Sequence, residues 1–217
     1  MKRAWLLLPI LLASDPALED RLARHRNLGK AFFENPTTHP QAVEQFRQAL
    51  ALASGSARER LNFGLALLAN GQTAEGIAEL EKVQRQDPSL PHTWFNLGVQ
   101  FKKSGDWGRS QRQLEGFLKL VPNEPVAHYN LGTLHKLAAR TPEAIATFET
   151  ATRLGPNLAA PHFQLYNLYR QAGRGADAAR ELKLFQAAKD RQANSATPED
   201  MEWSFYSEIY DPVEPET

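Results

Sequence analysis

The sequence predicts an all-α solenoid built from antiparallel helix pairs, and three regularities lead to this prediction. A first series of residues is spaced by 34 positions and consists of glycines: Gly64, Gly98 and Gly132. A second series with the same spacing consists of prolines: Pro88, Pro122 and Pro156. Within each period, apolar residues fall at helical spacing in two separate stretches. Self-similarity at such a period is typical of stacked repeats, in which neighbouring units bury one another's apolar faces.

The period divides the chain into five predicted repeats that follow one another without a break. These repeats cover residues 22–56, 57–90, 91–124, 125–158 and 159–192. The first is one residue longer than the others, and the extra residue falls in the turn-rich stretch 34–40, where an insertion is tolerated. We therefore expect one continuous array rather than separate domains.

Each repeat is predicted to contain two helices. In the third repeat, apolar positions with helical spacing run from Trp94 to Phe101 and again from Leu114 to Leu118, with Gly105 in the turn between them. Pro122 ends the second helix before the next repeat begins. A glycine inside a helix, such as Gly98, costs about 1 kcal/mol relative to alanine. We therefore expect the neighbouring helix to pass too close there for a side chain.

The details of the repeat resemble a known motif. The third repeat carries Trp94, Leu97-Gly98, Phe101, Gly105-Asp106-Trp107, Leu114 and Pro122, and this pattern resembles the tetratricopeptide repeat. The fourth repeat departs from the motif, with His128 in place of the tryptophan and Ala139 in place of the turn glycine. The resemblance implies a right-handed superhelix in which the first helix of each pair lines the concave side.

A polar series accompanies the apolar one and gives the first candidate site. An amide residue stands immediately before the Leu-Gly pair, or its equivalent, in every repeat: Asn27, Asn62, Asn96, Asn130 and Gln164. The resemblance implies that an asparagine at this place faces the groove and hydrogen-bonds the backbone of a bound peptide. A carboxamide suits that task because it offers both a donor and an acceptor. The alternative is that these amides hydrogen-bond within their own helix pair.

Two further sets of residues are expected on the same helix faces. Aromatic residues precede the amides, and basic residues follow them: Phe95, Tyr129, Phe163, Lys102, Lys103, Lys136 and Arg170. A groove with these residues favours acidic segments or a free C-terminal carboxylate. The alternatives are packing between repeats for the aromatic residues and an ordinary solvated helix face for the basic residues.

The composition argues against catalysis and against nucleic-acid binding. The chain has 25 basic and 25 acidic residues and no cysteine, so it has no net field for nucleic acid and no thiolate for catalysis or metal binding. His25, His128 and His162 stand at the tryptophan position of the repeat, where we expect partly buried, hydrogen-bonded side chains. No phosphate-binding loop or nucleophile motif is present. We therefore predict a protein that is not an enzyme and needs no cofactor or metal.

The N-terminus resembles a secretory signal peptide. Residues 1–13 begin with Met1-Lys2-Arg3, continue with an apolar run and end before a polar Ser14-Asp15. The run is about half the length needed to span a bilayer, so we expect no stable membrane span. We predict a bacterial protein exported to the periplasm, with a linker over residues 14–21; the alternative is a cytoplasmic protein.

The C-terminal residues 193–217 lack the repeat and are acidic. Thr197 and Pro198 are typical of a helix start, and Met201, Phe205 and Ile209 follow at helical spacing. We expect a helix over residues 198–209 that caps the last repeat.

The predicted function is that of a non-enzymatic adaptor that binds an extended peptide in the concave groove. The alternatives are a structural component of an envelope complex that works by self-association and a regulatory subunit of a separate enzyme. The sequence does not indicate the oligomeric state.

Overall fold

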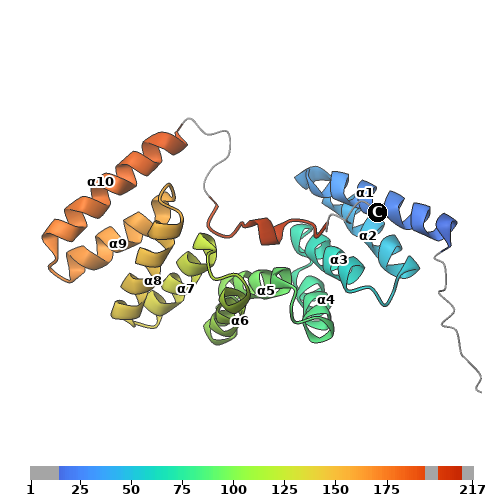
Figure 1. Ribbon diagram of the computed structural model, residues 1–217, viewed down its shortest axis with the longest axis horizontal. Helices are drawn as coiled ribbons and strands as arrows, with labels where there is room; N and C mark the ends of the chain where they lie inside the picture. The colour runs from blue at the N-terminus through green and yellow to red at the C-terminus, as the bar shows by residue number, and fades with distance from the viewer. Residues whose placement is uncertain (1–14, 194–199, 212–217) are drawn as a thin grey trace, which may run out of the picture.

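A computed structural model describes residues 15–193 and 200–211, and over these ranges the chain is helical without any strand (Figure 1). The α-helices are α1 (Pro16–Phe33), α2 (His39–Leu52), α3 (Ala57–Ala69), α4 (Thr73–Gln86), α5 (Pro91–Lys103), α6 (Trp107–Leu120), α7 (Pro125–Leu137), α8 (Thr141–Leu154), α9 (Ala159–Gln171) and α10 (Gly175–Gln192). Two short 3₁₀ turns accompany them, η1 (Pro36–Thr38) and η2 (Phe205–Ser207).

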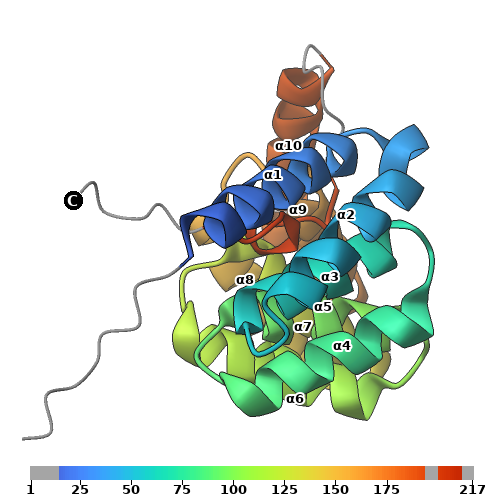
Figure 2. The ribbon, with the colours of Figure 1, turned by 90° about the vertical axis from the view of Figure 1, so that its right-hand side faces the viewer.

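Consecutive helices pack as pairs, and the pairs stack into an arc with α1 and α2 at one end and α9 and α10 at the other (Figures 1 and 2). This arrangement confirms the predicted helical solenoid. Helices α3, α5, α7 and α9 start at the first residues of the predicted repeats. At the N-terminal end, the expected linker over residues 14–21 is helical from Pro16 onward, because the side chain of Asp15 caps α1 and Pro16 occupies its first turn. The predicted signal peptide, residues 1–13, lies outside the described residues.

Apart from the α1–α2 connection, the turn inside each helix pair contains a left-handed residue. Gly71, Gly105 and Gly173 have φ angles of 76°, 78° and 71° in three of these turns. In the turn of the fourth repeat, Ala139 takes the same place with a φ of 56°. Only glycine adopts this conformation without a steric penalty, so Ala139 leaves the fourth repeat with a strained turn.

The recurring glycines inside the first helices allow the paired helices to approach closely. A Cβ atom built on Gly98 would lie 2.9 Å from Cδ2 of Leu114, and one built on Gly132 would lie 2.8 Å from the ring of Phe148. Both distances are shorter than an ordinary van der Waals contact. The expected close passage of the second helix is therefore present.

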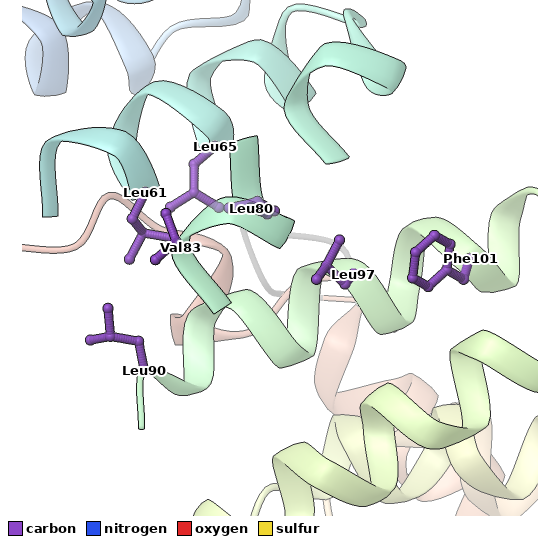
Figure 3. Packing of buried hydrophobic residues seen from close by; sticks show 7 residues of the cluster. All are labelled: Leu61, Leu65, Leu80, Val83, Leu90, Leu97 and Phe101. Carbon is purple, nitrogen blue, oxygen red and sulfur yellow. The ribbon is translucent and has the colours of Figure 1, made fainter. Parts of the chain in front are cut away.

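The apolar core is distributed along the array rather than gathered in one place. One cluster joins α3, α4 and α5, and Figure 3 shows its members Leu61, Leu65, Leu80, Val83, Leu90, Leu97 and Phe101. Other clusters join α2 to α3, α5 to α6 and α7, and α8 to α9 and α10. Each of these clusters joins one helix pair to the next, so the pairs stabilise one another along the array.

The residues at the repeat's tryptophan position hold the turn between successive pairs. Nε1 of Trp94 donates a hydrogen bond to the carbonyl oxygen of Pro88 at 2.8 Å, and Nε2 of His128 lies 2.9 Å from that of Pro122. Nε2 of His162 lies 3.4 Å from the carbonyl oxygen of Pro156. The histidines therefore replace tryptophan in a structural hydrogen bond, as expected.

The expected capping helix over residues 198–209 is wrong for the part that the structure describes. Residues 200–211, called here the C-terminal segment, contain only the turn η2 and otherwise non-helical backbone. The segment lies across the concave side of the arc, against α5 and its neighbours, and not on α10 (Figure 1). Its peptide groups bond to side chains of the groove, which removes the need for internal helical bonds.

Candidate functional site

The concave face of α3, α5 and α7 binds the main chain of the C-terminal segment. Asn62 makes a pair of bonds with Tyr210: its Nδ2 donates to the carbonyl oxygen at 2.9 Å, and its Oδ1 accepts from the backbone N–H at 2.8 Å. Nδ2 of Asn96 donates to the carbonyl oxygen of Tyr206 at 2.7 Å, and Nδ2 of Asn130 donates to that of Met201 at 2.7 Å. The segment therefore crosses the repeats in the direction opposite to the array.

Asn96 and Asn130 are also bonded to their own helices. Nδ2 of Asn96 donates to the carbonyl oxygen of His92 at 2.8 Å, and Nδ2 of Asn130 donates to that of Val126 at 2.8 Å. A carboxamide nitrogen carries two hydrogens, so one can bond the helix and the other the segment. The two alternatives raised by the sequence are thus compatible, since the intrahelical bond fixes the direction in which the second hydrogen points.

Ion pairs hold both ends of the C-terminal segment. Nζ of Lys102 and Nζ of Lys103 lie 3.2 Å and 2.7 Å from the carboxylate of Glu202. At the other end, Arg58 and Lys30 lie 2.6 Å and 3.0 Å from the carboxylate of Asp211. Burial alone would raise the pKa of Glu202, but the hydrogen bonds and charges of Lys103 and Lys102 outweigh it and lower that pKa.

Apolar side chains of the segment pack onto the floor of the groove. Met201 and Tyr206 contact the cluster that contains Phe95 and Phe117, and the rings of Tyr206 and Phe117 meet edge to face at 5.0 Å. Ile209 and Tyr210 contact the cluster shown in Figure 3. Phe95 is itself fully buried, with its ring centroid 5.4 Å from that of Phe117, so it forms part of the floor.

His92 is a titratable group that lies against the aromatic rings of the segment. Its ring centroid lies 5.2 Å from that of Tyr206, 4.9 Å from that of Tyr210 and 6.1 Å from that of Phe205. Burial lowers the pKa of His92 to about 4. Its Nδ1 atom is buried and has no hydrogen-bond partner in the described part of the chain. A proton on His92 is therefore strongly disfavoured while the segment is in place.

The C-terminal segment does not fill the groove. One hollow of about 510 Å³ lies between the segment and α1 and includes Phe33, His92 and Phe205 in its wall. A second hollow of about 480 Å³ lies on the other side of the segment and includes Leu65, Gln100 and Trp203. The groove therefore has space for side chains larger than those that now occupy it.

The remaining predicted site residues lie beside the segment or beyond it. Asn27 is exposed in a small hollow that it shares with Asn62 and Tyr210. The others have partners on nearby helices: Lys136 Nζ donates to Gln164 at 2.8 Å, Arg170 lies over the ring of Tyr166 at 5.5 Å, Phe163 packs against Phe185 at 5.2 Å, and Tyr129 against Phe148 at 5.6 Å. The structure thus brings Asn62, Asn96 and Asn130 together with Lys102 and Lys103 around the C-terminal segment, whereas Lys136 and Arg170 have other partners.

Three contributors to the groove were not singled out in the sequence. Arg58 and His92 each stand four residues before a groove asparagine, and Lys30 stands three residues after Asn27. This spacing places them on the same helix face as the amides, so helical periodicity could have identified them. Their role depends on the C-terminal segment, whose position the sequence did not indicate.

The described residues show neither a metal-binding cluster nor a membrane-spanning helix. No group of histidine and acidic side chains within residues 15–193 and 200–211 is arranged to hold a metal ion. Over the same residues, no helix combines the length and the apolar character that crossing a bilayer demands. Buried His162 and Glu181 lie 2.8 Å apart between α9 and α10, away from the groove.

Comparisons with known proteins agree with this architecture. A family model described as "Tetratricopeptide repeat" matches residues 28–91 and 95–159. Among solved structures, a MamA RS-1 double mutant has a TM-score of 0.72 at 16% identity and covers 81% of this chain and 98% of its own. MamA from Desulfovibrio magneticus RS-1 has a TM-score of 0.67 at 16% identity and covers 82% and 98%. PilF of Pseudomonas aeruginosa has a TM-score of 0.70 at 17% identity and covers 79% and 78%. No curated protein matches the chain in sequence.

Proposed function

Because the chain belongs to the tetratricopeptide-repeat family, we propose that it is a non-enzymatic adaptor that binds an extended segment of another polypeptide in its concave groove. The groove comprises the faces of α1, α3, α5 and α7 that contact the C-terminal segment. The observation that carries this proposal is the set of bonds from Asn62, Asn96 and Asn130 to the main chain of that segment. Bonds to the main chain are available from any sequence, which suits an adaptor.

Selectivity would come from the charges at the two ends of the occupied groove. Lys102 and Lys103 bind one carboxylate and Arg58 and Lys30 bind another, so an acidic partner is favoured over a neutral or basic one. Each pair is partly exposed and contributes little by itself, about 1 kcal/mol or less. The charges therefore select the partner, and the main-chain bonds and apolar contacts supply most of the affinity.

The signal-like residues 1–13 support a location outside the cytoplasm, where the partner would then also be found. N-terminal sequencing of the natively expressed protein tests this part of the proposal. A mature chain that begins near Ser14 is the expected result, and an intact Met1 on cytoplasmic protein would contradict it.

The binding test requires a groove that is free of the chain's own C-terminal segment. We define the released variant as full-length protein with Glu202→Lys, Tyr206→Ser and Asp211→Lys, which removes both ion-pair anchors and one ring from the groove and leaves α1 to α10 unchanged. The probe is a fluorescently labelled synthetic peptide with the sequence of residues 200–211. We expect this peptide to bind the released variant with measurable affinity.

Adding Asn96→Ala and Asn130→Ala to the released variant should weaken that binding. Each lost hydrogen bond is worth about 0.5–1.5 kcal/mol net, so the affinity should fall about 5- to 150-fold. Asn167→Ala is the matched control, because Asn167 makes the same kind of bond to its own helix, at 3.0 Å to the carbonyl oxygen of Phe163, without a bond to the segment. Circular dichroism checks that all variants stay folded. Unchanged affinity in the double alanine variant would contradict the proposed function.

A further inference from the structure

We propose that the C-terminal segment is a built-in competitor for the groove, and that the partner is an acidic, aromatic-containing extended segment of another protein that binds by displacing it. The inference rests on the proposed function and adds two things to it. It assigns the free protein a closed state, in which the C-terminal segment occupies the groove. It also identifies the chemical character of the partner from the residues that now occupy its place.

The closed state uses the binding groups that a partner would need. The second hydrogen of the Asn96 and Asn130 amides and both polar atoms of Asn62 are engaged by the segment. Lys102 and Lys103 are paired with Glu202, and Arg58 and Lys30 with Asp211. Two chains cannot use these groups at once, so binding of a partner requires the segment to leave.

The chemistry of the segment describes the ligand that fits. Carboxylates stand nine positions apart, at 202 and 211, and match the two basic ends of the groove. Between them, Tyr206, Ile209 and Tyr210 contact apolar clusters of the floor. We therefore expect a partner segment with an acidic residue at each end and aromatic or large aliphatic residues between.

Several features make the segment a displaceable occupant. Hollows of about 510 and 480 Å³ flank it, and Trp203 and Phe205 remain 51% and 68% exposed. At η2 the backbone bonds to itself instead of the groove, with Ser207 N–H donating to Ser204 at 2.8 Å and Glu208 N–H to Phe205 at 3.1 Å. A fully extended partner that also filled the hollows would make contacts that the segment leaves unmade.

Covalent attachment compensates for this incomplete fit. A segment joined to its site by a short stretch of chain acts at an effective concentration on the order of 1 mM. If the detached segment bound with a dissociation constant of about 10–100 μM, the tethered one would occupy the groove about 90–99% of the time. An external peptide of the same sequence would then bind the native protein about 10- to 100-fold more weakly than an open groove.

The test compares native full-length protein with the released variant, using the labelled peptide of residues 200–211. The inference predicts at least tenfold tighter binding to the released variant. The nuclear magnetic resonance signal of the Tyr210 amide, which donates to Asn62 in the closed state, reports whether the segment is bound. It should show a bonded amide in the native protein and a solvent-exposed one in the released variant. Asp200→Asn is the control, because it removes a charge of the segment while keeping an oxygen at the position that accepts from the Glu202 N–H at 2.8 Å.

The outcomes separate this inference from the proposed function. Equal affinity for the native protein and the released variant would overturn the competitor but leave the adaptor role standing. Binding to neither protein would overturn both. A native protein that forms dimers at the assay concentration, with the bonded Tyr210 amide lost on dilution, would also overturn the inference, because the groove would then hold the segment of a second copy.

Discussion

Acidification should release the C-terminal segment, because His92 is buried beneath it. The pKa of His92 is about 4 with the segment in place, compared with an ordinary value of 6.5. Above pH 6.5 the imidazole is neutral in both states and has no effect on closure. Below pH 6.5 only the released state takes up the proton, so closure weakens as the pH falls, until the buried histidine is also protonated near pH 4.

The size of this effect follows from the two pKa values. Each pH unit between 6.5 and 4 disfavours the closed state by about 1.4 kcal/mol, or about tenfold. At pH 5 the loss is about 2 kcal/mol, or about 30-fold, so a segment that is bound 90–99% of the time at pH 7 would be bound about 25–75% of the time. The hollow beside His92 is also lined by Lys30, Glu34, Glu208 and Asp211. Burial, rather than these charges, lowers the pKa of His92.

The assay is a pH titration of the Tyr210 amide resonance in native protein and in His92→Phe, which keeps an aromatic ring beneath the segment but cannot be protonated. The native segment should open between pH 6 and about 4.5. The His92→Phe segment should stay closed until Glu202, whose pKa is lowered in the closed state, begins to lose its charge below its ordinary value of 4.5. Identical titrations of the two proteins would show that protonation of His92 does not release the segment.

Three further predictions concern stability and charge. Gly116→Ala should destabilise the fold by about 1–3 kcal/mol in urea unfolding, because the new Cβ would lie 2.3 Å from the ring of Trp94. Gly108→Ala on the same helix should be neutral or stabilising, because its Cβ would make only an ordinary contact with Arg112 at 3.8 Å; equal effects would contradict this packing. Ala139→Gly should raise the free energy of unfolding by about 1 kcal/mol, because it relieves the left-handed alanine; a loss of stability would be the opposite result. Lys103→Glu should weaken closure, read at the Tyr210 amide, and the effect should shrink in 1 M salt because half-exposed charges are screened; a salt-independent effect would point to a structural cause.

The fold was predictable because its signals repeat. Glycines, prolines and apolar residues share one period, so several independent series of residues mark each repeat. The predicted array of helix pairs is confirmed. The resemblance to the tetratricopeptide repeat implied that Asn62, Asn96 and Asn130 lie on the concave side. Departures such as Ala139 were visible as well, because they interrupt an otherwise constant pattern.

The C-terminal segment was not predictable in the same way. Met201, Phe205 and Ile209 stand at helical spacing, which favoured a capping helix. A short isolated helix is only marginally stable, however, and here the groove amides offer the backbone bonds at Tyr206 and Tyr210 that outweigh the helical ones. That competition depends on contacts between residues more than one hundred positions apart, about which local periodicity carries no information. Helical periodicity could have placed Arg58, Lys30 and His92 on the groove face, but their role depends on the C-terminal segment, whose position the sequence did not indicate.

The central claim is that the groove recognises the main chain of an extended segment, and a single backbone change tests it most directly. The measurement is the affinity of the released variant for two peptides of residues 200–211, one N-methylated at Tyr210 and one at Phe205. Methylation at Tyr210 removes the N–H that donates to Asn62 at 2.8 Å. Methylation at Phe205 alters the first residue of η2, whose N–H has no partner within the turn. We expect the Tyr210 peptide to bind about 2- to 12-fold more weakly than the unmodified one, because it loses one hydrogen bond, and the Phe205 peptide to bind nearly as well as the unmodified one. Equal binding of both modified peptides would contradict main-chain recognition.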